Sequence, residues 1–144
     1  MLERAAVLLG IAIAVVAATG IIRAWSTRRL RRLQFEGPAP LWSALGERPD
    51  GRPSLVVFST PGCTVCRTTQ RPAVESVLSA FGTGLRVLSI DLADRPSVGR
   101  VFNVLTAPTT VVLDRDGEIR SINHGFAPAD VLAAQITALG ASPA

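Results

Sequence analysis

Residues 55–66 read LVVFSTPGCTVC and join a short apolar run to a pair of cysteines. The run at residues 55–58 is continuous and rich in β-branched side chains, which is typical of a strand buried on both faces. Ser, Thr, Pro and Gly follow it and indicate a turn. From Cys63 to Phe81 apolar side chains recur at helical spacing. The stretch therefore predicts a buried strand that leads directly into a helix with Cys63 and Cys66 at its start.

The rest of the chain repeats this alternation and then ends in a hairpin and a helix. Pro72 is expected to kink the first helix, because proline lacks an N–H donor and its ring clashes with the preceding turn. Later elements are expected at residues 85–90 (strand), 91–103 (short helix), 109–113 and 118–122 (strands joined by an Asp-Gly turn) and 129–139 (amphipathic helix). This order predicts an α/β domain with a mixed central sheet and helices on both of its faces.

Residues 5–22 form an apolar run of 18 residues without a charge. As a helix the run is about 27 Å long, close to the thickness of about 30 Å of the bilayer hydrocarbon. Trp25 lies where an interfacial anchor is expected. Glu3 offsets Arg4, whereas a signal peptide has a basic start. We therefore expect one transmembrane anchor over residues 1–25, with a cleaved signal peptide and a buried core helix as the alternatives.

The net charge of +4 belongs to the first third of the chain. From residue 54 onward seven Arg are balanced by seven acidic residues, while five Arg cluster at residues 23–32, after the apolar run. A neutral globular part gives no reason to expect nucleic acid. Basic residues beside a span are retained on the cytoplasmic side. This favours a single-pass protein of the cell membrane with a cytoplasmic domain and lipid contacts at the Arg cluster; an extracytoplasmic domain is the alternative.

Residues 26–53 are predicted to be a linker that is basic at first and then rich in proline and glycine. Within it residues 41–45 have the pattern of one helical turn, with Trp42 either packed on the domain or solvated. The single globular domain is expected to span residues 54–144.

The two cysteines lie three positions apart, so they belong to one local site and build no structural disulfide framework. The thiolate is the attacking species in disulfide exchange, and a free cysteine with a pKa near ~8.5 supplies little of it at neutral pH. A helix N-terminus stabilises an anion through its unpaired amides and its dipole. Cys63 is placed to attack, and Cys66, one turn further on the same face, to resolve the mixed disulfide.

Two other uses of the cysteine pair stay open. A Cys-x-x-Cys can be half of a zinc site, but a tetrahedral site needs four ligands and His124 is the only other strong candidate. The pair can also be buried and inert. His124 itself is interpreted as a surface histidine, and the acidic turn of Asp114, Asp116 and Glu118 as a solvated hairpin tip.

Taken together, residues 55–139 resemble the thioredoxin superfamily. The matching features are Val56-Val57-Phe58 before Cys63-x-x-Cys66, Ile90-Asp91 at the end of the next strand, Thr106-Ala107-Pro108-Thr109 before the third, and Gly125 after the hairpin. The resemblance implies a thioredoxin-like fold in which Pro108 is a cis-proline facing the sulfurs and the Ala107 backbone pairs with a substrate peptide. Pro61 and Gly62 would complete the substrate contact. Cis X-Pro bonds are scarce and mark tight turns; the alternative is that Pro108 only starts a strand.

The chain also departs from the family pattern. Gly62 stands where members usually have a tryptophan, so Pro61-Gly62 is more similar to a glutaredoxin approach. The usual buried acid and its lysine correspond to Val57 and Val87, which avoids an unpaired buried charge and leaves the proton of Cys66 without its usual acceptor. Thr64-Val65 matches neither reducing nor strongly oxidising members, so the direction of electron flow stays open.

The sequence thus predicts a membrane-tethered thiol-disulfide oxidoreductase that needs no bound cofactor or metal. Its expected partners are protein disulfides or dithiols, an electron donor or acceptor that the sequence does not identify, and membrane lipid. The alternative is a non-catalytic thioredoxin-fold module for binding or assembly, as in the maturation of cytochromes or metal centres.

Overall fold

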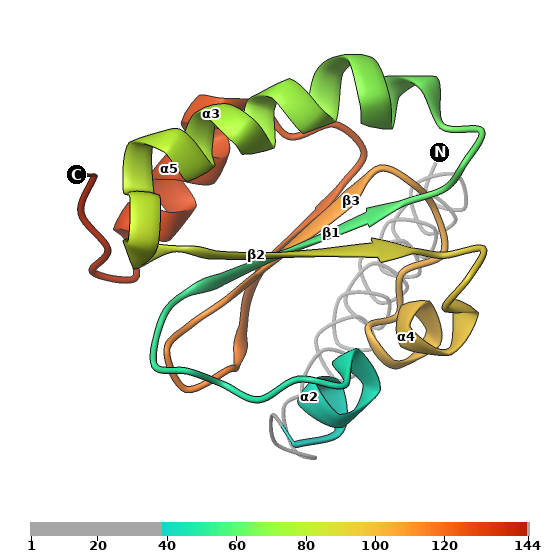
Figure 1. Cartoon of the computed structure of the whole chain (residues 1–144), viewed down its shortest axis with the longest axis horizontal. Coiled ribbons are helices and arrows are strands. Elements are labelled where there is room, and N and C mark those ends of the chain that lie inside the picture. Colours follow the sequence, from blue (N-terminus) through green and yellow to red (C-terminus); the bar gives the residue numbers. More distant parts are fainter. Residues whose placement is uncertain (1–38, 144) are drawn as a thin grey trace, which may run out of the picture. The chain divides into compact units, whose positions relative to one another are not determined.

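The computed structural model describes residues 39–143, in which a four-stranded sheet lies between two layers of helices (Figure 1). The elements are α2 (Ala39–Leu45), β1 (Ser54–Ser59), a π-helical segment (Cys66–Gln70), α3 (Arg71–Phe81), a 3₁₀ turn (Gly82–Gly84), β2 (Arg86–Asp91), α4 (Pro96–Val101), β3 (Thr109–Leu113), β4 (Ile119–His124) and α5 (Ala129–Thr137). The strands are ordered β2-β1-β3-β4. β1 is parallel to β2 and antiparallel to β3, and β3 is antiparallel to β4. The mixed sheet predicted from the sequence is therefore confirmed.

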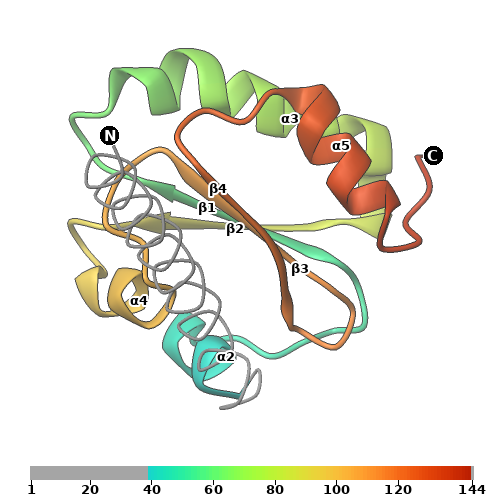
Figure 2. The same cartoon turned by 180° about the vertical axis from the view of Figure 1, so that it is seen from behind.

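Each face of the sheet has its own apolar core. On one face α3 and α5 cover the sheet, and on the other α2 and α4 do, which the view from behind also shows (Figure 2). Leu55 belongs to the first core, whereas Val56 and Phe58 belong to the second. Successive strand residues point to opposite faces, so β1 must be apolar at consecutive positions to fill both cores. This confirms the prediction of a strand buried on both faces.

The segment before Ser54, interpreted as linker, is packed against the domain from α2 onward. Trp42 is only 4% exposed and is buried with Leu41 and Leu45 against the α4 side of the sheet. Its indole Nε1 donates to Gly117 O in the β3–β4 loop at 3.2 Å. Of the two placements expected for Trp42, the packed one is confirmed, and α2 supplies apolar side chains to the second core.

The helix that carries the cysteines has a π-helical turn, residues 66–70, directly before α3 and Pro72. The N–H of Arg71 donates to Cys66 O, five residues back. Pro72 is the second residue of α3, but helical backbone already begins at Thr64. The proline therefore lies inside a continuous helix, and its missing N–H removes one helical hydrogen bond. The proline that was expected to kink the helix is therefore accommodated by a wider turn, and such π turns are frequent at functional sites.

The predicted anchor at residues 5–22 lies outside the described residues, as does the Arg cluster after it. Within residues 39–143 every helix is too short or too polar to cross a bilayer.

Candidate functional site

Cys63 and Cys66 lie where β1 gives way to the helical layer, as the sequence predicts. The turn after β1 is closed by the amide of Cys63, which donates to Thr60 O at 3.1 Å, and helical backbone begins at Thr64. The two sulfurs form a disulfide, with the Cα atoms 5.3 Å apart. The pair is therefore a dithiol whose spacing permits an internal disulfide, at the start of a helix.

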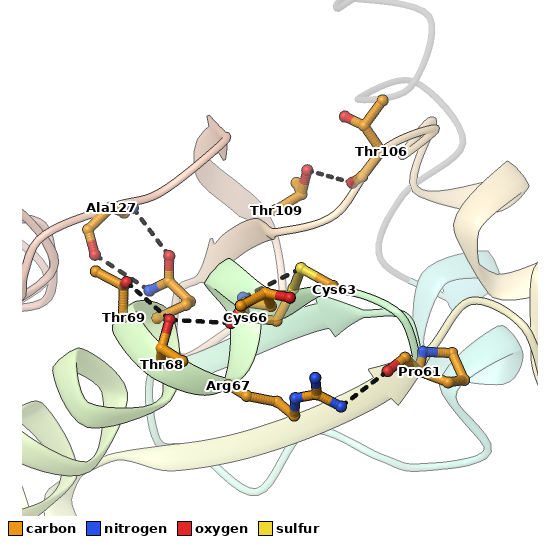
Figure 3. Close-up of a disulfide and its surroundings, with 11 residues drawn as sticks. Pro61, Cys63, Cys66, Arg67, Thr68, Thr69, Thr106, Thr109 and Ala127 are labelled. Atoms are coloured by element: carbon orange, nitrogen blue, oxygen red, sulfur yellow. Dashed lines mark hydrogen bonds between the residues drawn. A yellow bond between two sulfur atoms is a disulfide. The ribbon is translucent and has the colours of Figure 1, made fainter.

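The helix start directs a donor at the first sulfur. The backbone N–H of Cys66 donates to Cys63 Sγ at 3.1 Å (Figure 3). This amide is one of those that a helix leaves unpaired in its first turn, and the helix dipole adds positive charge at the same end. Both effects favour the thiolate over the thiol at Cys63 once the disulfide is reduced.

The two cysteines differ in exposure. Cys63 is partly exposed between the exposed residues Pro61, Gly62 and Thr64, whereas Cys66 is 8% exposed. A bulky protein disulfide can therefore reach the first sulfur more easily than the second. This asymmetry matches an attacking Cys63 and a resolving Cys66.

Two contacts hold the helix start in place. Arg67 donates to the carbonyl of Pro61 at 3.2 Å, which ties the first helical turn to the turn before it (Figure 3). The buried side chain of Gln70 both donates to Ala127 O (3.1 Å) and accepts from Ala127 N–H (2.9 Å). The helix that carries the cysteines is thus fixed to the loop between β4 and α5. Gln70 was not among the residues predicted from the sequence, because a lone glutamine in a helical pattern has no signal that marks it as buried.

The Ala107–Pro108 peptide bond is cis, as the family resemblance implies. β1 and β3 pair with Phe58 opposite Thr109, so Pro108 is next to the end of β1, where the cysteine turn begins. The segment is held by Thr109 Oγ1, which donates to Thr106 O at 2.8 Å, and by Gly125 N–H, which donates to Pro108 O at 2.9 Å. Pro108 is buried, and Ala107 is partly exposed.

The other sequence candidates lie away from the cysteines. His124 is exposed at the end of β4. Asp114 differs from the expected solvated tip: it is 7% exposed and accepts from the N–H groups of Asp116 and Glu118 and from the guanidinium of Arg120. Burial by itself would raise the pKa of Asp114, but the bonds from Glu118 and Arg120 outweigh it and hold that pKa below its usual value. Asp114 therefore organises the β3–β4 loop.

A groove lies beside Cys66, and the sequence did not predict it. It has a volume of about 710 Å³ and lies between α3 and the sheet edge formed by β2. Its lining includes the apolar residues Val57 and Val87 and the carboxyl-bearing residues Glu75 and Asp91. Cys66 thus lines this groove, whereas Cys63 is not among its lining residues.

A family model, a curated relative and solved structures all relate this chain to thioredoxins. The thioredoxin family model matches residues 47–138. Thioredoxin of Bacillus subtilis (strain 168) is 30% identical over 78 residues, which cover 54% of this chain and 73% of that protein. Among solved structures, a mutant thioredoxin from Halobacterium salinarum NRC-1 has 25% identity and a TM-score of 0.57 over 63% of this chain and 77% of that chain. MTB dsbF, in its mixed oxidized and reduced forms, has 20% identity and a TM-score of 0.52 over 62% and 81%, a likeness of fold alone.

Proposed function

The chain belongs to the thioredoxin family, and from this premise we propose that it is a membrane-tethered thiol-disulfide oxidoreductase acting on protein disulfides or dithiols through Cys63 and Cys66. The single observation that carries the proposal is the backbone N–H of Cys66 directed at Cys63 Sγ from a helix start. A donor in this position stabilises the thiolate that disulfide exchange requires.

In the reducing direction the reaction has two steps. The Cys63 thiolate attacks one sulfur of a client disulfide; a bond forms between Cys63 and that sulfur, and the other client sulfur leaves as a thiolate. Cys66 then loses its proton and attacks Cys63 Sγ, which forms the internal disulfide and releases the second client thiolate. A partner dithiol must then reduce the protein, and in the oxidising direction an acceptor disulfide must reoxidise it.

The surroundings of Cys63 supply the proposed client site. Pro61 and Gly62 are exposed in the turn before the cysteine. Ala107 is partly exposed two residues before Thr109, which pairs with Phe58 near the end of β1. We assign the backbone of Ala107 to pairing with an extended client segment, and Pro108 to shaping that segment. Gly62 adds no side chain that a client would have to avoid.

A comparison of two cysteine variants of the full chain tests the proposal. Cys63→Ser and Cys66→Ser both abolish the internal disulfide, so they are matched for any loss of stability that follows. Reduction of insulin disulfides is expected to vanish in both. Only Cys66→Ser is expected to accumulate a covalent mixed disulfide with insulin, visible on a non-reducing gel. Turnover by the Cys63→Ser variant would overturn the proposal.

The non-catalytic alternative makes a different prediction for the same experiment. The apolar Val57 and Val87 in the groove and the missing side chain at Gly62 are the features that favour it. A passive binding or assembly module would retain its partner in both variants without a covalent bond. Mixed disulfides that form only when Cys63 is present would exclude it.

We also propose that residues 1–25 anchor the protein in the cell membrane with residues 54–144 on the cytoplasmic side. The support is the uncharged run at residues 5–22 and the five Arg that follow it. A cysteine added after Ala144, in a background with Cys63→Ser and Cys66→Ser, reports the side. In intact cells an impermeant maleimide is expected to leave this cysteine unlabelled until the membrane is opened. Labelling of intact cells would place the domain outside.

A further inference from the structure

The groove beside Cys66 combines a reacting sulfur with a solvent route. Its volume of about 710 Å³ is many times the ~30 Å³ that one water molecule occupies in the liquid. The hydroxyl-bearing residues Ser59, Thr60 and Ser89 line it together with Cys66. Apolar side chains line the rest of the groove, so these hydroxyls and the charged residues described below are the groups that can bind water there.

The second step of the proposed reaction requires such a route. Cys66 attacks only as a thiolate, and its proton must leave while the client still covers Cys63. Cys66 is 8% exposed, so direct contact with bulk solvent is small. Val57 and Val87, the strand residues at the positions of the family's usual acid and lysine, line the groove but have no group that can take up a proton.

Four charged residues line the groove. Arg67 and Arg71 come from the π-helical segment and the start of α3, Glu75 from α3, and Asp91 from β2; the β1 residues in the lining are uncharged. The two guanidinium groups favour an anion in the groove, including the thiolate of Cys66. Glu75 and Asp91 are the groups that can accept a proton.

Asp91 is the better placed of the two. It is the last residue of β2 and pairs with Ser59, the last residue of β1, so it lies at the end of the sheet where the cysteine turn begins. Glu75 is one turn further along α3 than Arg71 and is exposed. One carboxylate oxygen of Asp91 accepts from the N–H of Ala93 at 2.8 Å, which fixes the side chain and leaves its other oxygen available.

We propose that this groove is the proton exit of the resolving cysteine and that Asp91 accepts the proton through water. The inference rests on the proposed function, because it concerns the second step of that reaction. The S–H bond of Cys66 breaks, its proton passes through groove water to the Asp91 carboxylate, and the thiolate attacks Cys63 Sγ. The client sulfur leaves as a thiolate and takes a proton from solvent, and Asp91 returns its own proton to the groove water.

The two steps can be timed separately in the full chain held in detergent micelles. The reduced protein is mixed with dithionitrobenzoate in a stopped-flow instrument. Attack by Cys63 releases one coloured thiolate at a rate that depends on reagent concentration. Attack by Cys66 on the mixed disulfide releases a second one at a rate that does not. Each rate is measured from pH 5 to pH 10.

Asp91→Asn is the decisive variant. Asparagine keeps an oxygen that can accept from Ala93 N–H but cannot take up a proton. Asp94→Asn is the matched control, because it removes the same charge three residues further on, in the turn after β2, at a position that does not line the groove. General acid–base assistance is worth about 10²-fold or more at full strength, and since water and Glu75 remain, we expect about tenfold slower second release at pH 7, with the midpoint of its pH profile moved upward.

Each result has a distinct meaning. A slowed second release in Asp91→Asn alone, with the first release unchanged and the deficit disappearing at high pH, supports the proton exit. An unchanged second release in Asp91→Asn, or a slowing equal in Asp94→Asn, overturns it. If the wild-type protein releases no second thiolate, the proposed function itself is wrong. The Asp91→Asn result, by contrast, tests only the proton exit.

Discussion

Truncation of Trp42 to alanine is expected to destabilise the domain severely, although the residue lies outside the segment that the sequence assigned to the domain. The side chain is 4% exposed, and a buried tryptophan removes about 200 Å² from water. At about 25 cal/mol per Å² this contributes roughly 5 kcal/mol, of which an alanine retains about 1. The change also leaves the carbonyl of Gly117 without its indole donor, worth about 1 kcal/mol.

The expected loss is therefore about 5 kcal/mol, at the upper end of values for Trp→Ala changes. It is comparable to the whole free energy of unfolding of a small domain, about 5 to 15 kcal/mol. Arg86, whose guanidinium carbon lies 5.8 Å from the centre of the indole ring, loses a cation–π contact in addition. Trp42→Phe keeps most of the apolar area and loses the hydrogen bond, so it should cost about 1 to 2 kcal/mol.

Urea unfolding of the oxidised full chain in micelles, followed by circular dichroism, measures these values. The midpoint should fall while the slope with urea stays the same, since the surface exposed on unfolding changes little. Leu105→Ala is the control, because Leu105 is 82% exposed and its truncation should change the free energy by less than about 0.5 kcal/mol. A free energy of unfolding for Trp42→Ala within about 1 kcal/mol of the wild-type value would refute the reasoning. It would mean that α2 contributes little to the stability of the domain.

Three further outcomes are expected. A Cβ on Gly117 would overlap the indole of Trp42, and this glycine has a φ of 84°, so Gly117→Ala should lower the free energy of unfolding by about 2 kcal/mol or more, measured by urea titration. The pKa of Asp114 is lowered in the folded protein, so the carboxylate stabilises the fold above the usual aspartate pKa, and this effect disappears as the pH falls through the pKa of the folded state. Asp114→Asn should therefore lower the free energy of unfolding at pH 7. The difference in free energy between variant and wild type should shrink on acidification below about pH 4. In the reduced protein, brief treatment with iodoacetamide followed by peptide mass spectrometry should find Cys63 alkylated well before Cys66, because Cys66 is the more buried of the two. Equal rates would contradict this difference in exposure.

Local patterns determined much of the site. The apolar run of β1 had to be buried on both faces, because consecutive strand residues point to opposite sides. A turn and a helical pattern after it put Cys63 at a helix start, and the structure places it there. The family resemblance added the cis bond before Pro108. These features depend on residues within a few positions of one another, or on a motif, so they can be read along the chain.

The tertiary structure alone decided which distant residues meet. Trp42 reaches Gly117 across 75 positions, and Gln70 reaches Ala127 across 57. The spacing of apolar residues indicates which face of an element is buried, but it does not identify the distant residue that this face contacts in the folded protein. The groove that joins Cys66 to Asp91 is likewise a product of the β1–β2 register and the position of α3 above it. The sequence by itself therefore determined the strand, the helix start and the cysteine pair, while packing decided which core α2 joins and which groove Cys66 lines.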